Sequence, residues 1–93
     1  MTELDSVRID KWLWAARFFK TRSLAQDAIE LGRVRVRGER IKPSREVRVG
    51  ELLEITRGEE HFEVYVEALS QVRGPAREAA RLYRETDESQ VLR

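Results

Sequence analysis

The chain has 93 residues, 41% of them hydrophobic and 38% charged, with a formal net charge of +1 and no cysteine. This length fits one domain, since compact domains usually hold about 100–150 residues, and a chain without cysteine can form neither disulfides nor thiolate zinc sites. No segment approaches the roughly 18 uncharged apolar residues of a membrane-spanning helix, and the acidic N-terminus lacks the apolar run of a secretory signal. We therefore expect a single domain over residues 1–93, located in the cytoplasm.

The two halves of the chain carry opposite charge. Residues 1–50 hold 12 Lys and Arg against 7 Asp and Glu, whereas residues 51–93 hold 6 against 10. A positive face set against a negative one favours an anionic partner, such as nucleic acid, on one side of the molecule.

Residues 8–19 are predicted to form the first helix. Its buried face consists of apolar residues at helical spacing, namely Ile9, Trp12, Leu13, Ala16 and Phe19. Trp14 and Phe18 lie on the other side, and we expect them to be buried as well, because large aromatic residues contribute most to a small core.

A second helix is predicted over residues 23–31. Thr21 or Ser23 can cap its N-terminus, and Ser23 with Gln26 fits a capping box. Gly32 is expected to end the helix in a left-handed conformation. The expected apolar arc of this helix consists of Leu24, Ala25, Ala28, Ile29 and Leu31.

Beyond this helix the period of the hydrophobic pattern changes from 3.6 to 2, which predicts strands. They are predicted around Val34 and Val36, at 47–49, at 52–56 and at 62–66, with a turn at Gly38 and Glu39 and a hairpin loop at Gly58.

The C-terminal part is predicted to hold one more helix. Pro75 suits the first turn of a helix over 76–83, and we expect a polar, frayed tail over 86–93. The whole pattern predicts an α+β fold: two N-terminal helices packed on a small, mostly antiparallel sheet, plus a C-terminal helix.

The sequence has no residue set typical of an enzyme. It lacks a glycine-rich phosphate loop, and the single histidine, His61, lies beside a hairpin loop without a serine partner. The many glutamates of residues 51–67 fit a solvated sheet face. We expect no catalytic activity, no metal and no cofactor.

Strand alternation places Arg33, Arg35 and Arg37 on one face, with next-but-one neighbours about 6.6 Å apart. Such charges repel one another and need counter-charges or water. Glu39 or Glu46 could supply one or two carboxylates, whereas phosphate matches the planar guanidinium fork. Phosphate is the alternative that we favour.

A second basic site precedes the second helix. Lys20 and Arg22 flank Thr21, next to backbone amides that also attract phosphate. Simple capping by Thr21 or Ser23 explains the hydroxyl residues equally well, and both roles are compatible.

The order of residues resembles the S4-type (alpha-L) RNA-binding domain over about residues 8–57. The matching segments are Arg8-Ile9-Asp10-Lys11, Thr21-Arg22-Ser23, Ala25, Ile29, Gly32 to Val36, Gly38 and Lys42-Pro43-Ser44. The resemblance implies two helices on a small sheet, with RNA bound by the start of the second helix and the following strand. The motif commonly has asparagine where this chain has Arg37.

A narrower resemblance, to the bacterial heat-shock protein 15 family, covers nearly the whole chain. It rests on Lys11 to Arg22 and on Pro75 to Thr86. It implies a non-enzymatic stress factor that binds ribosomal RNA on free large subunits still carrying peptidyl-tRNA and helps to recycle them. It further implies binding of DNA and single-stranded RNA. We expect a monomer with no membrane partner.

By position, the resemblance implies RNA contacts at Arg8, Lys11, Lys20, Thr21, Arg22, Ser23, Gln26, Arg33, Arg35, Arg37 and Lys42. Charge and spacing alone indicate the helix start and the arginine strand. Arg8, Lys11, Gln26 and Lys42 depend more on the resemblance.

Two other functions stay open from the sequence. The chain could be the RNA-binding appendage of a modifying enzyme such as a pseudouridine synthase, although 93 residues leave no room for a catalytic domain. It could also be a protein-interaction adaptor that uses its acidic C-terminal half.

Overall fold

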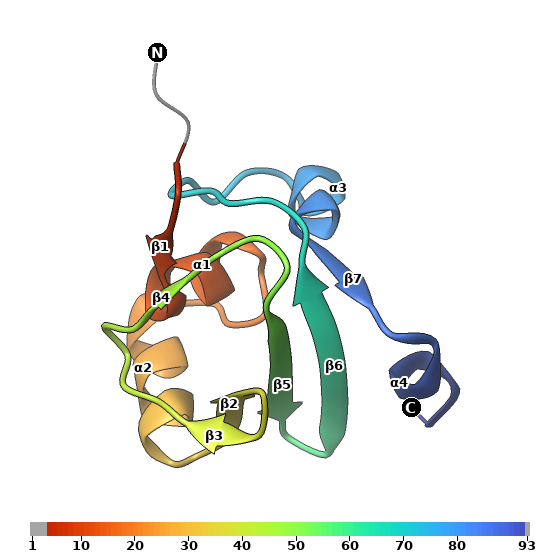
Figure 1. Cartoon of the computed structure of the whole chain (residues 1–93). Helices are drawn as coiled ribbons and strands as arrows, with labels where there is room; N and C mark the ends of the chain where they lie inside the picture. The colour runs from red at the N-terminus through yellow and green to blue at the C-terminus, as the bar shows by residue number, and fades with distance from the viewer. Residues whose placement is uncertain (1–3, 93) are drawn as a thin grey trace.

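The computed structural model describes residues 4–92 (Figure 1). Its elements are β1 (Val7–Arg8), α1 (Ile9–Ala15), α2 (Arg22–Glu30), β2 (Val34–Val36), β3 (Glu39–Arg40), β4 (Glu46–Val47), β5 (Leu52–Arg57), β6 (Glu60–Val66), α3 (Ala76–Ala79), the 3-10 turn η1 (Ala80–Leu82), β7 (Tyr83–Glu85) and α4 (Asp87–Leu92). The α+β class is confirmed.

Five strands form the main sheet in the order β3-β2-β5-β6-β7, and β1 pairs separately with β4. Each of these pairings is antiparallel. Figure 1 shows α1 and α2 on one side of the sheet and α4 beyond β7 at its far edge. The antiparallel sheet expected from the sequence is therefore present, and three short strands, β1, β3 and β7, were not indicated by the pattern.

One face of the sheet is buried and the other is open. Val34 of β2 is paired with Ile55 of β5, and both are buried in one core with α1 and α2. The alternate row, Arg35 and Glu54, is exposed. This alternation is the one that the period-2 pattern predicts.

The first helix ends four residues earlier than predicted. Arg17 adopts a left-handed backbone with φ of 66°, and the Phe18 amide donates to the Leu13 carbonyl at 3.0 Å. These are features of a Schellman motif, with arginine in the position that glycine usually takes. Phe18 is buried as expected, but it reaches the core from the turn and not from the helix. Trp14 is half-buried.

The second helix begins at Arg22 because Thr21 is its N-cap. The Thr21 Oγ1 accepts a hydrogen bond of 3.0 Å from the Leu24 amide. The prediction of a capping box formed by Ser23 and Gln26 is wrong, because the Gln26 side chain donates to Asp10 in α1 instead. Gly32 ends the helix with φ of 76°, as predicted. Two members of the expected apolar arc, Leu24 and Leu31, are exposed.

The C-terminal part differs from the prediction in two places. The helix expected over 76–83 stops at Ala79 and continues as η1, because Tyr83 to Glu85 pair with the free edge of β6. The tail expected to fray contains α4 instead. The hydroxyl of Ser89, which is buried, accepts from the Glu63 amide and donates to Glu85, and these bonds hold α4 against the sheet.

None of the helices within residues 4–92 is long and apolar enough to span a membrane.

Candidate nucleic-acid interface

A buried carboxylate joins the starts of the two N-terminal helices. Asp10 in α1 has no exposed surface, and its Oδ2 accepts hydrogen bonds from Gln26 Nε2 at 2.8 Å and Arg8 Nη2 at 3.0 Å. Arg22 Nη2 lies 3.5 Å from the same oxygen, and the Lys11 amide donates to Oδ1 at 2.7 Å. Three predicted site residues, Arg8, Arg22 and Gln26, therefore converge on one carboxylate.

The environment of Asp10 keeps it ionised. Burial raises the pKa of its carboxyl, but hydrogen bonds from Gln26, Arg8 and the Lys11 amide more than offset this, so the pKa lies below its ordinary value. The ionised carboxylate partly neutralises the guanidiniums of Arg8 and Arg22, whose side chains as a whole are 47% and 40% exposed.

Arg22 is held at some energetic cost. Its Nε is buried and has no hydrogen-bond partner among the residues that the structure describes. An unpaired buried donor typically costs about 1–3 kcal/mol. Natural sequences keep such local defects mainly at functional sites, which favours a functional role for this side chain.

The other end of α2 carries a second group of arginines. Arg35 Nε donates to the Gly32 carbonyl at 3.2 Å, and Arg40 Nη2 donates to the Glu30 carbonyl at 2.7 Å. Both cations thus satisfy carbonyls at the negative end of the helix dipole. This explains why Arg35 and Arg40, directly opposite each other across β2 and β3, tolerate like charges.

The arginine stripe lacks the carboxylate partners that the sequence offered. Within residues 4–92, Arg33, Arg35 and Arg37 form no ion pair within 4.0 Å, whether with Glu39, with Glu46 or with any other carboxylate. The cross-strand neighbour of Arg35 on the exposed face is Glu54. Arg37 is not on the strand, because it occupies the hairpin turn with φ of 52°.

A basic segment runs beside α2 and connects its two ends. The segment from β3 to β4 begins at Arg40, which contacts the end of α2, and reaches α1 where the Ile9 amide donates to the Arg45 carbonyl at 2.7 Å (Figure 1). A shallow hollow of about 510 Å³ on this segment is lined by Arg40, Ile41, Lys42, Ser44 and Arg45. Lys42, which the resemblance implies as an RNA contact, lies in this hollow. Arg40 and Ser44, which line it as well, were not among the predicted residues.

The remaining predicted residues lie around the start of α2. Lys20, Thr21 and Ser23 are exposed there, and the first turn of α2 holds no acidic residue that would offset its positive end. Lys11 is half-buried in α1. The sequence analysis did not predict Asp10 as part of this surface, because its only signal in the sequence is an acidic residue that lies between Arg8 and Lys11.

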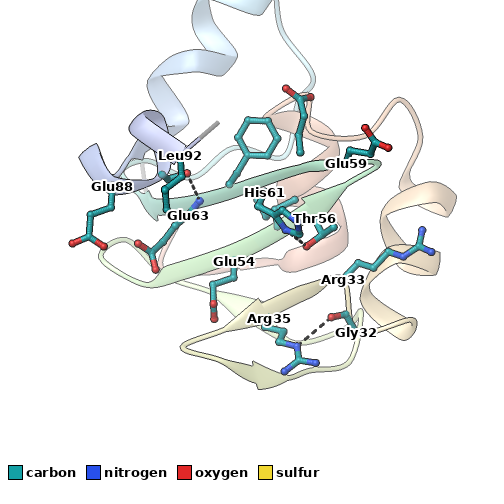
Figure 2. Close-up of a pocket in the computed structure, with 14 residues that line it drawn as sticks. Gly32, Arg33, Arg35, Glu54, Thr56, Glu59, His61, Glu63, Glu88 and Leu92 are labelled. Atoms are coloured by element: carbon teal, nitrogen blue, oxygen red, sulfur yellow. Dashed lines mark hydrogen bonds between the residues drawn. The ribbon is translucent and has the colours of Figure 1, made fainter.

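The exposed face of the sheet is a groove of about 840 Å³ with a different character. Figure 2 shows Arg33 and Arg35 at one end of it and Glu63 and Glu88 at the other. The lining holds two arginines and five glutamates, so phosphate is repelled over most of the groove. Anion binding is therefore expected beside α2, including the end of the groove that holds Arg33 and Arg35, and not over the acidic remainder of the sheet.

His61 has an ordinary partner in this groove. It lies in β6, and its Nδ1 is 3.0 Å from Thr56 Oγ1 on the neighbouring strand (Figure 2). No group of three or more potential metal ligands occurs in the described part of the chain.

A family model described as the S4 domain matches residues 7–53, which extend from β1 into β5. The chain belongs to the S4 domain family. The resemblance to heat-shock protein 15 is also confirmed: the chain is 52% identical to "Heat shock protein 15" of Escherichia coli strain K12 over 83 residues. That alignment covers 89% of this chain and 62% of the relative, so the chain spans less than two thirds of that protein.

Two further matches cover most of both partners. A solved structure described as trimeric heat shock protein 15 of Vibrio cholerae has a TM-score of 0.92 and 46% identity, covering 96% of this chain and 90% of that one. The "RQC P-site tRNA stabilizing factor" of Bacillus subtilis is 32% identical over 83% of this chain and 88% of its own length.

Proposed function

We propose that this protein is a non-enzymatic RNA-binding factor of the cytoplasm. It binds ribosomal RNA on large subunits that still carry peptidyl-tRNA and helps to recycle them under heat stress. DNA and single-stranded RNA are further ligands of the same surface.

The observation that carries the proposal is the distribution of cations around α2. Arg8 and Arg22 lie at its start, Arg33, Arg35 and Arg40 at its end, and a basic segment links the two. A helix of nine residues is about 13 Å long, so these cations form a strip and not a single cluster. A strip of partly free guanidiniums suits consecutive phosphates of one nucleic-acid strand.

The relatives support the biological setting. Heat shock is in the name of one group of relatives, and stabilisation of P-site tRNA is in the name of another. The first name fits a role in heat stress, and the second fits a factor that acts where P-site tRNA is held.

The decisive experiment compares two double variants of equal charge. Arg33→Gln with Arg35→Gln removes two cations at the end of α2, and Arg77→Gln with Arg81→Gln removes two exposed cations near α3. Affinity for a labelled rRNA fragment and for purified large subunits is measured over a series of salt concentrations. The first pair should weaken binding and make the log–log salt slope shallower by about two, and the second should leave both unchanged.

Equal effects of the two pairs would show that only net charge matters and would remove the proposed surface. A parent protein whose binding does not depend on salt would remove phosphate recognition altogether.

The acidic groove favours a second candidate, a protein-interaction adaptor. Five glutamates line it, and such a surface attracts a basic protein partner. A protein partner that is retained in a pull-down after nuclease treatment would support the adaptor over the RNA-binding factor.

A further inference from the structure

Asp10 stands out as an acidic residue at one end of a basic surface, beside the start of α2. A carboxylate there repels phosphate, so electrostatics alone would select against it. It nevertheless has no exposed surface, and it accepts hydrogen bonds from side chains of two elements besides its own helix.

Two of the donors to Asp10, Arg8 and Arg22, have partly exposed side chains beside the start of α2. Arg8 uses two nitrogens, with Nε at 3.3 Å from Oδ1 and Nη2 at 3.0 Å from Oδ2, and Arg22 uses Nη2. Both guanidiniums keep further N–H donors outside this contact, since each guanidinium carries five. A long side chain that is already fixed loses less conformational entropy when a ligand binds it.

We propose that Asp10 is a positioning residue that holds Arg8, Arg22 and Gln26 in the orientation in which they contact RNA. This proposal rests on the proposed function, because it assigns a role within the same surface. It adds a specific and counterintuitive consequence: removing a negative charge from this surface weakens the binding of a polyanion.

The test is Asp10→Asn with Asp27→Asn as its matched control. Both variants remove one negative charge, and Asp27 is exposed on α2. An asparagine at position 10 keeps one acceptor oxygen, but it replaces the other with an NH2 group and carries no charge, so the side-chain donors can no longer all be satisfied and the guanidiniums are held less firmly. Affinity for the labelled rRNA fragment should fall about tenfold in Asp10→Asn, as expected for ordering two long side chains on binding. Asp27→Asn should bind as the parent does or slightly more tightly.

A double-mutant cycle separates positioning from a general loss of stability. Arg8→Gln is measured in the parent and in Asp10→Asn. If Asp10 acts through Arg8, the second substitution costs much less binding in the Asp10→Asn background, whereas independent effects would add. Additive losses would overturn the proposal.

NMR relaxation of the guanidinium groups in the free parent keeps the proposal falsifiable even if Asp10→Asn fails to fold. The proposal requires Arg8 and Arg22 side chains as rigid as the backbone before RNA is added, and freely mobile ones would overturn it. If the parent binds RNA but Asp10→Asn binds as tightly as Asp27→Asn, positioning alone is wrong. If the parent binds no RNA at any salt concentration, the proposed function is wrong and this proposal falls with it.

Discussion

The carboxylate of Asp10 in α1 accepts a hydrogen bond of 2.8 Å from the side-chain amide of Gln26 in α2. This contact joins the two helices at one point, and the same oxygen receives Arg8. The packing of the helices and the arrangement of the basic surface are therefore coupled through a single ionised group.

The stability that Asp10 contributes should depend on pH. Its folded-state pKa is depressed below the ordinary value of 3.8, so the contribution is complete above that value and is lost as the pH falls through the folded-state pKa. At pH 7, Asp10→Asn should lower the free energy of unfolding by about 2 kcal/mol. Urea denaturation of both proteins should show this difference shrinking below about pH 4. A difference that stays constant from pH 7 to pH 3 would contradict the prediction.

Arg37→Asn should stabilise the protein. Arg37 and Gly38 have φ of 52° and 80°, the two positive values of a type I′ hairpin turn, for which Asn-Gly is strongly preferred. Relief of the left-handed strain should raise stability by about 1 kcal/mol and the melting temperature by roughly 4–8 °C. Arg37→Gln is the matched control, because it removes the same charge without the preference for this conformation. A melting temperature that rises equally in both variants would attribute the gain to charge.

Ser89→Ala should loosen α4. The Ser89 hydroxyl accepts from the Glu63 amide at 2.9 Å and donates to Glu85 at 2.6 Å, so its removal leaves a strand N–H without its acceptor. The expected cost is about 1–3 kcal/mol. Hydrogen exchange should become faster at the Glu63 amide and throughout α4. The exposed Ser44→Ala should change neither, and unchanged exchange in Ser89→Ala would show that other contacts hold α4.

Trp12→Phe should destabilise the whole domain. The indole is fully buried, and its Nε1 donates to the Ala68 carbonyl at 2.9 Å, which holds the segment after β6 against α1. Losing the bond and the ring volume should cost about 2–4 kcal/mol, seen as a lower urea midpoint. Trp14→Phe, at a half-buried position, should cost less. A larger loss for Trp14→Phe would contradict this assignment of the two indoles.

The oligomeric state of this chain in solution can be compared directly with that of its solved relative. We predict a monomer, whereas the Vibrio cholerae relative is described as trimeric. Light scattering coupled to gel filtration at several concentrations measures the mass directly. A mass three times 10.9 kDa would show that the prediction is wrong.

Much of the local structure was determined by the sequence itself. The alternation of Val34 and Val36 with arginines predicted β2, Gly32 predicted the end of α2, and Gly58 predicted the hairpin of β5 and β6. These features depend on neighbours a few residues away, since the strand period and the left-handed preference of glycine are local properties. The basic character of the α2 start and of the following strand could also be predicted, because it depends only on which residues occur there in the sequence.

Only the tertiary structure decided which groups meet. Tyr83 to Glu85 became a strand because β6 offered a free edge, and the polar tail became α4 because Ser89 reached the Glu63 amide. Asp10 became buried where α1 meets the start of α2, and donors from α2, from Arg8 and from the Lys11 amide satisfy it there. Such contacts join residues far apart in the chain, and the free energy of a buried charge depends on every group packed around it.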